Sequence, residues 1–230
     1  MKIGIIGAMD EEIRLLKATL TEQQVNVHYG FEFTLGKVGQ HDIVLVKSGI
    51  GKVNATMSVM LLQQFYAVDL VLNTGSAGAL SPELAIGDVV IATSLSHHDV
   101  DVTAFGYVRG QMAGMPATYE PDAHYAEQLQ AVCEQLELSV TRGQIVSGDE
   151  FVNADERVAT IRRHFPEAVA CEMESAAIAQ AAYALQLPYI IVRAISDTAD
   201  HDASMTFDEF VVLAGQKSAQ MLLTFIEKLN

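Results

Sequence analysis

The chain has 230 residues, of which 14 are basic and 29 acidic, so its formal net charge at pH 7 is −15. That charge argues against nucleic-acid binding, which needs cationic surface to displace counterions from phosphate, and against attachment to an anionic membrane. Half of the residues are hydrophobic and 19% are charged, so we expect one folded domain over residues 1–230 rather than a disordered chain.

Apolar β-branched runs alternate with segments of helical period along the chain. Strands are predicted at residues 3–6, 43–46, 70–72, 89–92, 144–146 and 189–195, and an antiparallel hairpin arm at 31–39. Helices are predicted at residues 11–20, 53–65, 123–136, 171–184 and 207–229. This alternation indicates an α/β fold in which one mixed, mostly parallel twisted sheet is flanked by helices. Residues 99–119 have no clear period, which is typical of a lid or a binding loop.

The N-terminal stretch, the two cysteines and two adjacent histidines bear on the cellular location and on metal binding. The apolar stretch at the N-terminus is too short for a signal peptide, and Cys133 and Cys171 form neither a CxxC pair nor a disulfide framework. We therefore expect a cytoplasmic protein. His97 and His98 are adjacent, and neighbouring positions on a strand face opposite sides, so we expect no metal site.

Small or polar segments follow several of the predicted strands, at residues 7–12, 48–51, 74–78 and 196–197. In open α/β sheets ligands bind at the carboxyl ends of the strands, so we expect these four segments to share one rim and to form a site. The first segment resembles the start of a dinucleotide-binding fingerprint. However, Gly4 and Gly7 are not followed by a third glycine, and Glu22 has no obvious strand before it, which argues against a nicotinamide cofactor.

Five charged residues, two of them in these segments and three elsewhere in the chain, suggest acid–base chemistry. Asp197 follows a buried strand, where desolvation raises the pKa of a carboxyl group and keeps it protonated near neutrality, whereas Glu12 lies in the first turn of a helix. Arg193 inside the strand needs a carboxylate partner, either Glu172 or Glu174. These two glutamates point in different directions on a helix, so at most one would face a given pocket. One neutral acid, one ionised base and a polar anchor are what glycoside cleavage requires, although each acid could also serve as a helix or turn cap.

Seven segments make the sequence recognisable, in this order: IGIIGAMDEE, KSGIGKVNA, NTGSAGAL, HDVDVTAFGY, IVSGDEFV, EMES and VRAISDTAD. They resemble the bacterial 5′-methylthioadenosine/S-adenosylhomocysteine nucleosidases, of the purine nucleoside phosphorylase family, over essentially the whole chain. The resemblance implies a nucleoside phosphorylase-like fold, a homodimer without a cofactor, and small adenosine thioethers as substrates. It also implies hydrolysis of the N-glycosidic bond of 5′-methylthioadenosine, S-adenosylhomocysteine and 5′-deoxyadenosine through an oxocarbenium-like transition state.

The same resemblance implies roles for individual residues. Asp197, oriented by Ser196, would protonate the imidazole ring of adenine, and Glu12 would activate the attacking water. The other positions implied at the substrate are Ser76 and Arg193 at the water, Glu174 at the ribose hydroxyls, Met173 beneath the sugar, Phe151 and Val152 at adenine, Met9, Ile50 and Phe207 at the 5′-alkylthio group, and Gly78 and Glu172 nearby. From the partner subunit, Val102, Phe105 and Ala113 would complete the pocket.

Two departures from the family pattern leave substrate preference and loop order open: Ala113 stands where a proline is common, and Val100 where alanine is more usual. Two alternatives also stay open. A phosphorylase would place a phosphate beside Glu12, against a like-charge repulsion of about 4 kcal/mol per charge pair at 4 Å and an effective dielectric of 20. A non-catalytic nucleoside sensor would need a degraded acid–base set, whereas Glu12, Glu174 and Asp197 are all present.

Overall fold

The computed structural model describes residues 1–197 and 207–229, with side chains described up to residue 197 and from residue 215. Its strands are β1 Lys2–Gly7, β2 Thr21–His28, β3 Phe31–Val38, β4 His41–Lys47, β5 Leu70–Ala79, β6 Val89–His97, β7 Val140–Ser147, β8 Ala168–Glu172 and β9 Tyr189–Asp197. Its helices are α1 Asp10–Thr19, α2 Lys52–Tyr66, α3 Ala123–Gln135, α4 Asp155–His164, α5 Ser175–Leu185 and α6 Phe207–Lys228.

The strands form one mixed sheet in the order β2-β3-β4-β1-β5-β8-β7-β6-β9. Strand β1 runs parallel to β4 and β5, and β5 runs parallel to β9, whereas β2, β3 and β4 form an antiparallel meander. Because β5 pairs with β9 as well as with β8, the strands from β5 to β9 in this order close into a ring. The predicted α/β class is confirmed, but this half of the sheet is closed rather than open.

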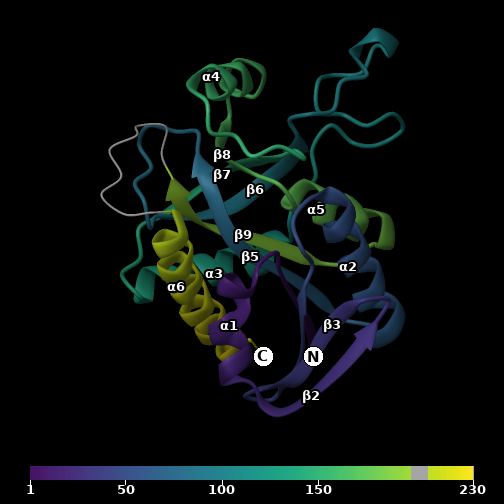
Figure 1. Ribbon diagram of the computed structural model, residues 1–230, viewed down its shortest axis with the longest axis vertical. Helices are drawn as coiled ribbons and strands as arrows, with labels where there is room; N and C mark the ends of the chain where they lie inside the picture. The colour runs from purple at the N-terminus through teal and green to yellow at the C-terminus, as the bar shows by residue number, and fades with distance from the viewer. Residues whose placement is uncertain (198–206, 230) are drawn as a thin grey trace.

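Helices cover both faces of the sheet (Figure 1). Successive strand side chains face opposite ways, so Ile3 and Ile5 of β1 join a core with α1, α3 and α6, whereas Ile6 joins a core with α2 and α5. Gly4 on the second face leaves room for α2, because an added Cβ would lie 3.0 Å from Leu62. The two apolar layers hold the central strands rigidly, so the residues at the strand ends have fixed positions.

Two sequence predictions were wrong at the ends of strands. Residues 171–184 are not one helix: Cys171 and Glu172 end the strand β8, where they pair with Val146 and Ser147 of β7, and α5 begins at Ser175. The alanine-rich composition of the following residues predicted a helix from residue 171 onward, so the end of the strand was not recognised. Residues 74–78 are not a loop either, since β5 continues through them paired with β9, with a register shift between Ala77 and Gly78. Strand pairing decided both outcomes.

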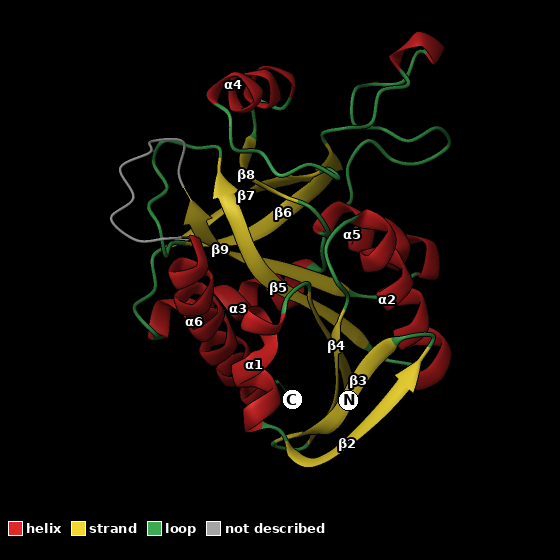
Figure 2. Ribbon diagram, viewed as in Figure 1, coloured by secondary structure: helices red, strands yellow, loops and turns green. Residues whose placement is uncertain are grey.

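The segment of residues 99–119 is irregular, as predicted, apart from a short 3-10 turn at Thr103–Phe105. It leaves the body of the protein after β6 and projects outward before it returns at Tyr119, whose backbone pairs with Leu95 (Figure 2).

None of the described helices is both long enough and apolar enough to cross a membrane.

Candidate active site

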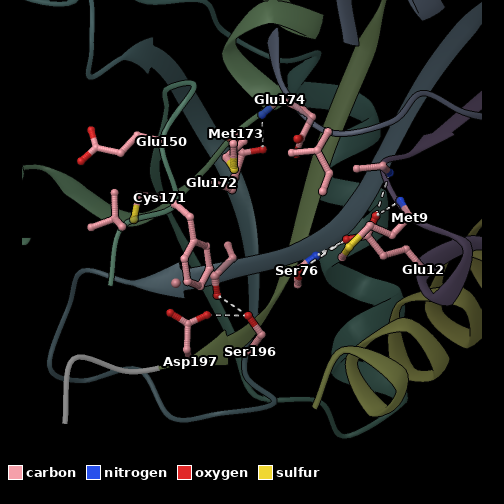
Figure 3. Close-up of a pocket in the computed structure, with 16 residues that line it drawn as sticks. Met9, Glu12, Ser76, Glu150, Cys171, Glu172, Met173, Glu174, Ser196 and Asp197 are labelled. Carbon is pink, nitrogen blue, oxygen red and sulfur yellow. Dashed lines mark hydrogen bonds between the residues drawn. The ribbon is translucent and has the colours of Figure 1, made fainter. Parts of the chain in front are cut away.

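A cavity of about 540 Å³ opens at the ends of β1, β5, β8 and β9. That size suits a small organic ligand. Twelve of the residues singled out from the sequence line it: Met9, Glu12, Ile50, Ser76, Gly78, Phe151, Val152, Glu172, Met173, Glu174, Ser196 and Asp197. Figure 3 shows the carboxyl groups of Glu12, Glu174 and Asp197 on different sides of this space. Phe207 is part of α6, but its side chain lies outside the described residues.

Glu12 is buried in the first turn of α1, and its carboxylate folds back onto the start of the helix. Oε2 accepts hydrogen bonds from the backbone amides of Ala8 at 2.7 Å and Met9 at 3.1 Å. Oε1 accepts hydrogen bonds from Ser76, from the amide at 3.0 Å and from the hydroxyl at 3.3 Å. The capping role expected for this residue is therefore present, and it also fixes a carboxylate at the cavity wall.

Arg193 lies beneath the cavity rather than in its wall, with 1% of its surface exposed. Its Nη2 donates hydrogen bonds to Glu172 Oε2 at 2.5 Å and to Asn73 Oδ1 at 2.8 Å, and it lies 3.6 Å from Glu174 Oε2. Both carboxylates named from the sequence are thus its partners. Gly75 separates this guanidinium from Glu12, since an added Cβ would lie 2.2 Å from Arg193 Nη1 and 2.7 Å from Glu12 Oε1.

Glu172 and Glu174 both reach the cavity, which contradicts the prediction that at most one would do so. The prediction assumed a helix, but Glu172 ends β8 and Glu174 is the residue before α5. The carboxylate of Glu172 accepts hydrogen bonds from the Ser147 hydroxyl and from the backbone amides of Glu174 and Ser175. Because Arg193 also donates to it, Glu172 braces the floor of the cavity.

Glu174 keeps an accepting oxygen for a ligand. Its Oε1 accepts a hydrogen bond from the Gly51 amide at 2.8 Å, while Oε2 faces Arg193. Burial, and then the nearby carboxylate of Glu172, raise the pKa of Glu174 to about 7, although Arg193 and the Gly51 amide act in the opposite direction. The carboxyl group is therefore able to exchange a proton near neutral pH.

Asp197 closes another side of the cavity at the end of β9. The Ser196 hydroxyl donates a hydrogen bond to Asp197 Oδ1 at 2.7 Å (Figure 3). Burial raises the pKa of Asp197, against the smaller effect of that hydrogen bond, as the sequence predicts. Gly78 permits this placement, because an added Cβ would lie 2.8 Å from Asp197 Oδ2. The group is thus suited to donate a proton to a ligand.

The walls between these groups are mostly apolar. Phe151, 57% exposed, and Ile50, 52% exposed, line the cavity together with the half-buried Met9 and Met173. Four lining residues were not singled out from the sequence: Ala8, Ala77, Glu150 and Cys171. All four are direct neighbours of predicted residues, which was the available signal. Burial raises the pKa of the Cys171 thiol to about 12, so it stays neutral.

Val102, Phe105 and Ala113 do not line this cavity within the chain itself. They belong to the projecting segment of residues 99–119, where the Phe105 side chain is 82% exposed.

A second hollow, of about 610 Å³, lies between this segment, α2 and α5, and four methionines line it: Met57, Met60, Met112 and Met115. His97 Nε2 donates a hydrogen bond to Gln180 Oε1 at 2.9 Å, and the described residues contain no cluster of three groups suited to a metal ion.

Comparison with known proteins gives one consistent family. Residues 2–227 match the phosphorylase superfamily. The chain is 47% identical over all of its length, and over all of the relative's, to the 5′-methylthioadenosine/S-adenosylhomocysteine nucleosidase of Lysinibacillus sphaericus. Two solved structures, which the chain matches over 100% of its own length, are similar to it. One is the Streptococcus pyogenes S-adenosylhomocysteine nucleosidase with 5-methylthiotubericidin, at TM-score 0.96, 46% identity and 98% of that chain. The other is the S. pneumoniae nucleosidase with the transition-state inhibitor MT-ImmA, at TM-score 0.95, 49% identity and 100% of that chain.

The likeness extends over the full length and includes the strands that carry the cavity residues, so the chain belongs to the phosphorylase superfamily and, within it, to the bacterial 5′-methylthioadenosine/S-adenosylhomocysteine nucleosidases.

Proposed function

We propose that this protein hydrolyses the N-glycosidic bond of 5′-methylthioadenosine, S-adenosylhomocysteine and 5′-deoxyadenosine, releasing adenine and the 5-substituted ribose without a cofactor. One observation carries the proposal: an acid of raised pKa, Asp197, and a hydrogen-bonded carboxylate, Glu12, line one cavity. Relatives named as nucleosidases of the first two substrates support it.

Asp197 acts as the general acid in this proposal. Burial raises its pKa, which favours the protonated form that a general acid needs, and the Ser196 hydrogen bond fixes its orientation. Transfer of that proton to an imidazole-ring nitrogen makes adenine a better leaving group, since the electron pair of the breaking C–N bond then neutralises a protonated purine, which departs as neutral adenine rather than as an anion. Phe151 stacks on the purine, and the backbone of Val152 contacts its edge.

Glu12 accepts a proton from the attacking water on the other side of the sugar. Ser76 supports this role because both of its donors bind Glu12 Oε1, which holds the carboxylate still. Arg193 acts from below the floor rather than on the water itself, because its guanidinium is bound to Glu172 and Asn73. The positive charge that develops on the sugar is stabilised by the negative charge of the surrounding carboxylates.

The remaining residues hold the substrate. Glu174 accepts hydrogen bonds from the ribose hydroxyls, and Met173 packs beneath the sugar. Met9 and Ile50 contact the 5′-alkylthio group, and a contribution of Phe207 to that end of the pocket stays a prediction. The apolar character of Met9 and Ile50 suits a thioether, which offers no strong hydrogen-bonding group.

Water rather than phosphate is the nucleophile in this proposal. Glu12, Glu172 and Glu174 all reach the cavity, so a phosphate dianion would meet several carboxylates. A repulsion of about 4 kcal/mol per charge pair at 4 Å and an effective dielectric of 20 disfavours such binding. The names of the relatives agree with hydrolysis, and a phosphorylase is therefore not favoured.

We also propose that the enzyme works as a homodimer in the cytoplasm, with Val102, Phe105 and Ala113 of one subunit completing the pocket of the other. The support is the exposure of Phe105 on a projecting segment and the methionine-lined hollow beside it. Large exposed apolar surface on a folded protein commonly marks an interface. The cytoplasmic location stays a prediction.

The test is adenine release by purified protein in phosphate-free buffer, followed by the change in ultraviolet absorbance. Methylthioadenosine should be hydrolysed without phosphate, and added phosphate should not accelerate the reaction. Asp197→Asn provides the inactive control. A strict requirement for phosphate, or no release of adenine at all, would contradict the proposal.

A further inference from the structure

Helix α2 begins at Lys52, and its N-cap residue is Gly51. Glycine has no side chain, so this residue cannot cap the first amides of the helix. The first amides of a helix need acceptors from elsewhere. The carboxylate of Asp149, 97 residues further along the chain, supplies one: its Oδ1 accepts a hydrogen bond from the Lys52 amide at 2.7 Å. Gly51 has φ +96° and an added Cβ would lie 3.0 Å from the same oxygen, so this junction requires glycine.

The amide of Gly51 points to a different carboxylate. It donates a hydrogen bond to Glu174 Oε1 at 2.8 Å. Two successive amides at the start of α2 are therefore bound by two acids, Gly51 by Glu174 and Lys52 by Asp149. The two amides lie in adjacent peptide planes that meet at the Gly51 Cα, so the φ of 96° and ψ of 161° at Gly51 set the direction of the first amide relative to the second.

Asp149 is itself held in place by Asp99. The amide of Asp149 donates to Asp99 Oδ2 at 3.0 Å, and the Lys52 ammonium group donates to both oxygens of Asp99 at 2.7 Å. The Lys52 and Asp99 side chains are 20% and 25% exposed, so water screens this pair less than an ordinary surface pair. Burial raises the pKa of Asp99, but the hydrogen bonds from Lys52 and Asp149 outweigh it, and the net shift is downward.

We propose that Asp149, held by Asp99 and Lys52, is a positioning residue of the nucleosidase reaction: it fixes the first turn of α2 so that the Gly51 amide aims Glu174 at the ribose hydroxyls. The inference rests on the proposed role of Glu174. Among the described residues that line the active-site cavity, neither Asp149 nor Asp99 occurs, so both act through Glu174 rather than on the substrate.

The main experiment compares Asp149→Ala and the conservative Asp149→Asn, whose amide oxygen still accepts a hydrogen bond. Glu32→Gln is the control for removal of a carboxylate charge outside this network, because Glu32 pairs with Lys17 at 2.6 Å, between α1 and β3. For Asp149→Ala we expect KM for methylthioadenosine to rise on the order of tenfold while kcat changes by less than about threefold, since uniform binding is lost. Asp149→Asn should recover most of the affinity, and Glu32→Gln should match the wild type.

A second substrate separates positioning from a general loss of structure. With a methylthioadenosine analogue that lacks both ribose hydroxyls, Glu174 has no hydroxyl to bind, so Asp149→Ala and the wild type should have KM values within about twofold. An equal rise in KM for both substrates would overturn the inference. If the wild type releases adenine but Asp149→Ala has an unchanged KM, the positioning role alone fails. If the wild type releases no adenine, the proposed function fails instead.

The pH profile gives a readout that a purely structural role would not change. The charged groups facing Glu174 are Glu172 on β8, Arg193 on β9 and Glu12 on α1, and none of them is altered in the variant. The Gly51 amide lowers the pKa of Glu174, so misplacing it in Asp149→Ala should move the acid limb of kcat/KM to higher pH. An acid limb at the wild-type position would overturn the inference.

Discussion

Glu12 Oε1 accepts two hydrogen bonds from Ser76, from the amide at 3.0 Å and from the hydroxyl at 3.3 Å. The two residues lie on α1 and β5, 64 positions apart in the chain. The contact joins the first turn of a helix to a buried strand, so the carboxylate cannot swing away from the cavity without losing both bonds. It therefore has the fixed geometry that a catalytic base needs.

Replacement of Ser76 by alanine should lower activity moderately. Ser76→Ala removes the hydroxyl donor and keeps the backbone donor, so we expect kcat/KM to fall on the order of tenfold, the size expected for one hydrogen bond to a charged group. Glu12→Gln should reduce kcat to near the background rate. Steady-state adenine release measures both. Equal losses in the two variants would contradict the division of roles between Glu12 and Ser76.

A methyl group at position 78 should affect the general acid. In Gly78→Ala the new Cβ would lie 2.8 Å from Asp197 Oδ2, which forces the carboxyl group to move. We expect kcat to fall by at least about tenfold, because misplacement of a catalytic group is costly. Asp197→Asn should abolish turnover but leave binding of methylthioadenosine, measured by calorimetry, mostly intact. Near-normal turnover in Asp197→Asn would contradict its role as the acid.

Much of the fold could be predicted from the sequence, because buried strands such as β1 and amphipathic helices such as α1 have strong periodic patterns. Elements that lack such patterns were missed. Strand β2 is polar and mostly exposed at the sheet edge, and α4 carries few apolar residues on one face. Strand β8 is short, and an alanine-rich helix follows it closely. In each case long-range pairing or packing, which local sequence does not encode, fixed the structure.

The sequence predicted which residues form the candidate site better than it predicted where they lie relative to one another. Motifs placed Glu12 and Asp197 correctly at helix and strand ends. They could not reveal that Arg193 lies under the floor, because its depth depends on the partners that three separate elements provide. The contact between Gly51 and Glu174 likewise joins distant parts of the chain. Sequence patterns identify such groups but do not measure their separation.

Activity should depend on pH through two groups. The pKa of Glu174 is raised to about 7, so below that pH its carboxylate takes up a proton and accepts the ribose hydroxyls less well. The pKa of Asp197 is also raised, and as the pH rises through it this acid loses the proton that it must donate. The profile of kcat/KM should therefore fall on both sides. Glu174→Gln should be less active but flatter on the acid side, and an unchanged acid limb would exclude Glu174 as its source.

Plain adenosine should be a poorer substrate than methylthioadenosine. Its 5′-hydroxyl would lie against Met9 and Ile50, which offer no hydrogen bond. An unsatisfied hydroxyl costs about 1–3 kcal/mol, so we expect kcat/KM to be lower on the order of tenfold to a hundredfold. Competition between the two nucleosides, followed by chromatography of the products, measures the ratio directly. Equal values would show that a polar group or an ordered water satisfies the hydroxyl.

Mixed dimers should reveal whether Phe105 acts in the neighbouring subunit. Phe105→Ala removes an exposed side chain that lies outside this chain's own cavity, and Val108→Ala, 56% exposed on the same segment, is its matched control. Phe105→Ala should be weakly active, Val108→Ala close to normal, and Asp197→Asn inactive.

The decisive measurement refolds Phe105→Ala and Asp197→Asn subunits together. Half of the resulting dimers contain one subunit of each kind. Each of these mixed dimers has one site that combines Asp197 of one subunit with Phe105 of the other. Activity should therefore return to roughly a quarter of the wild-type value, as random pairing in a two-fold dimer dictates. If Phe105 served the cavity of its own chain, no site in the mixture would be complete and no activity would return.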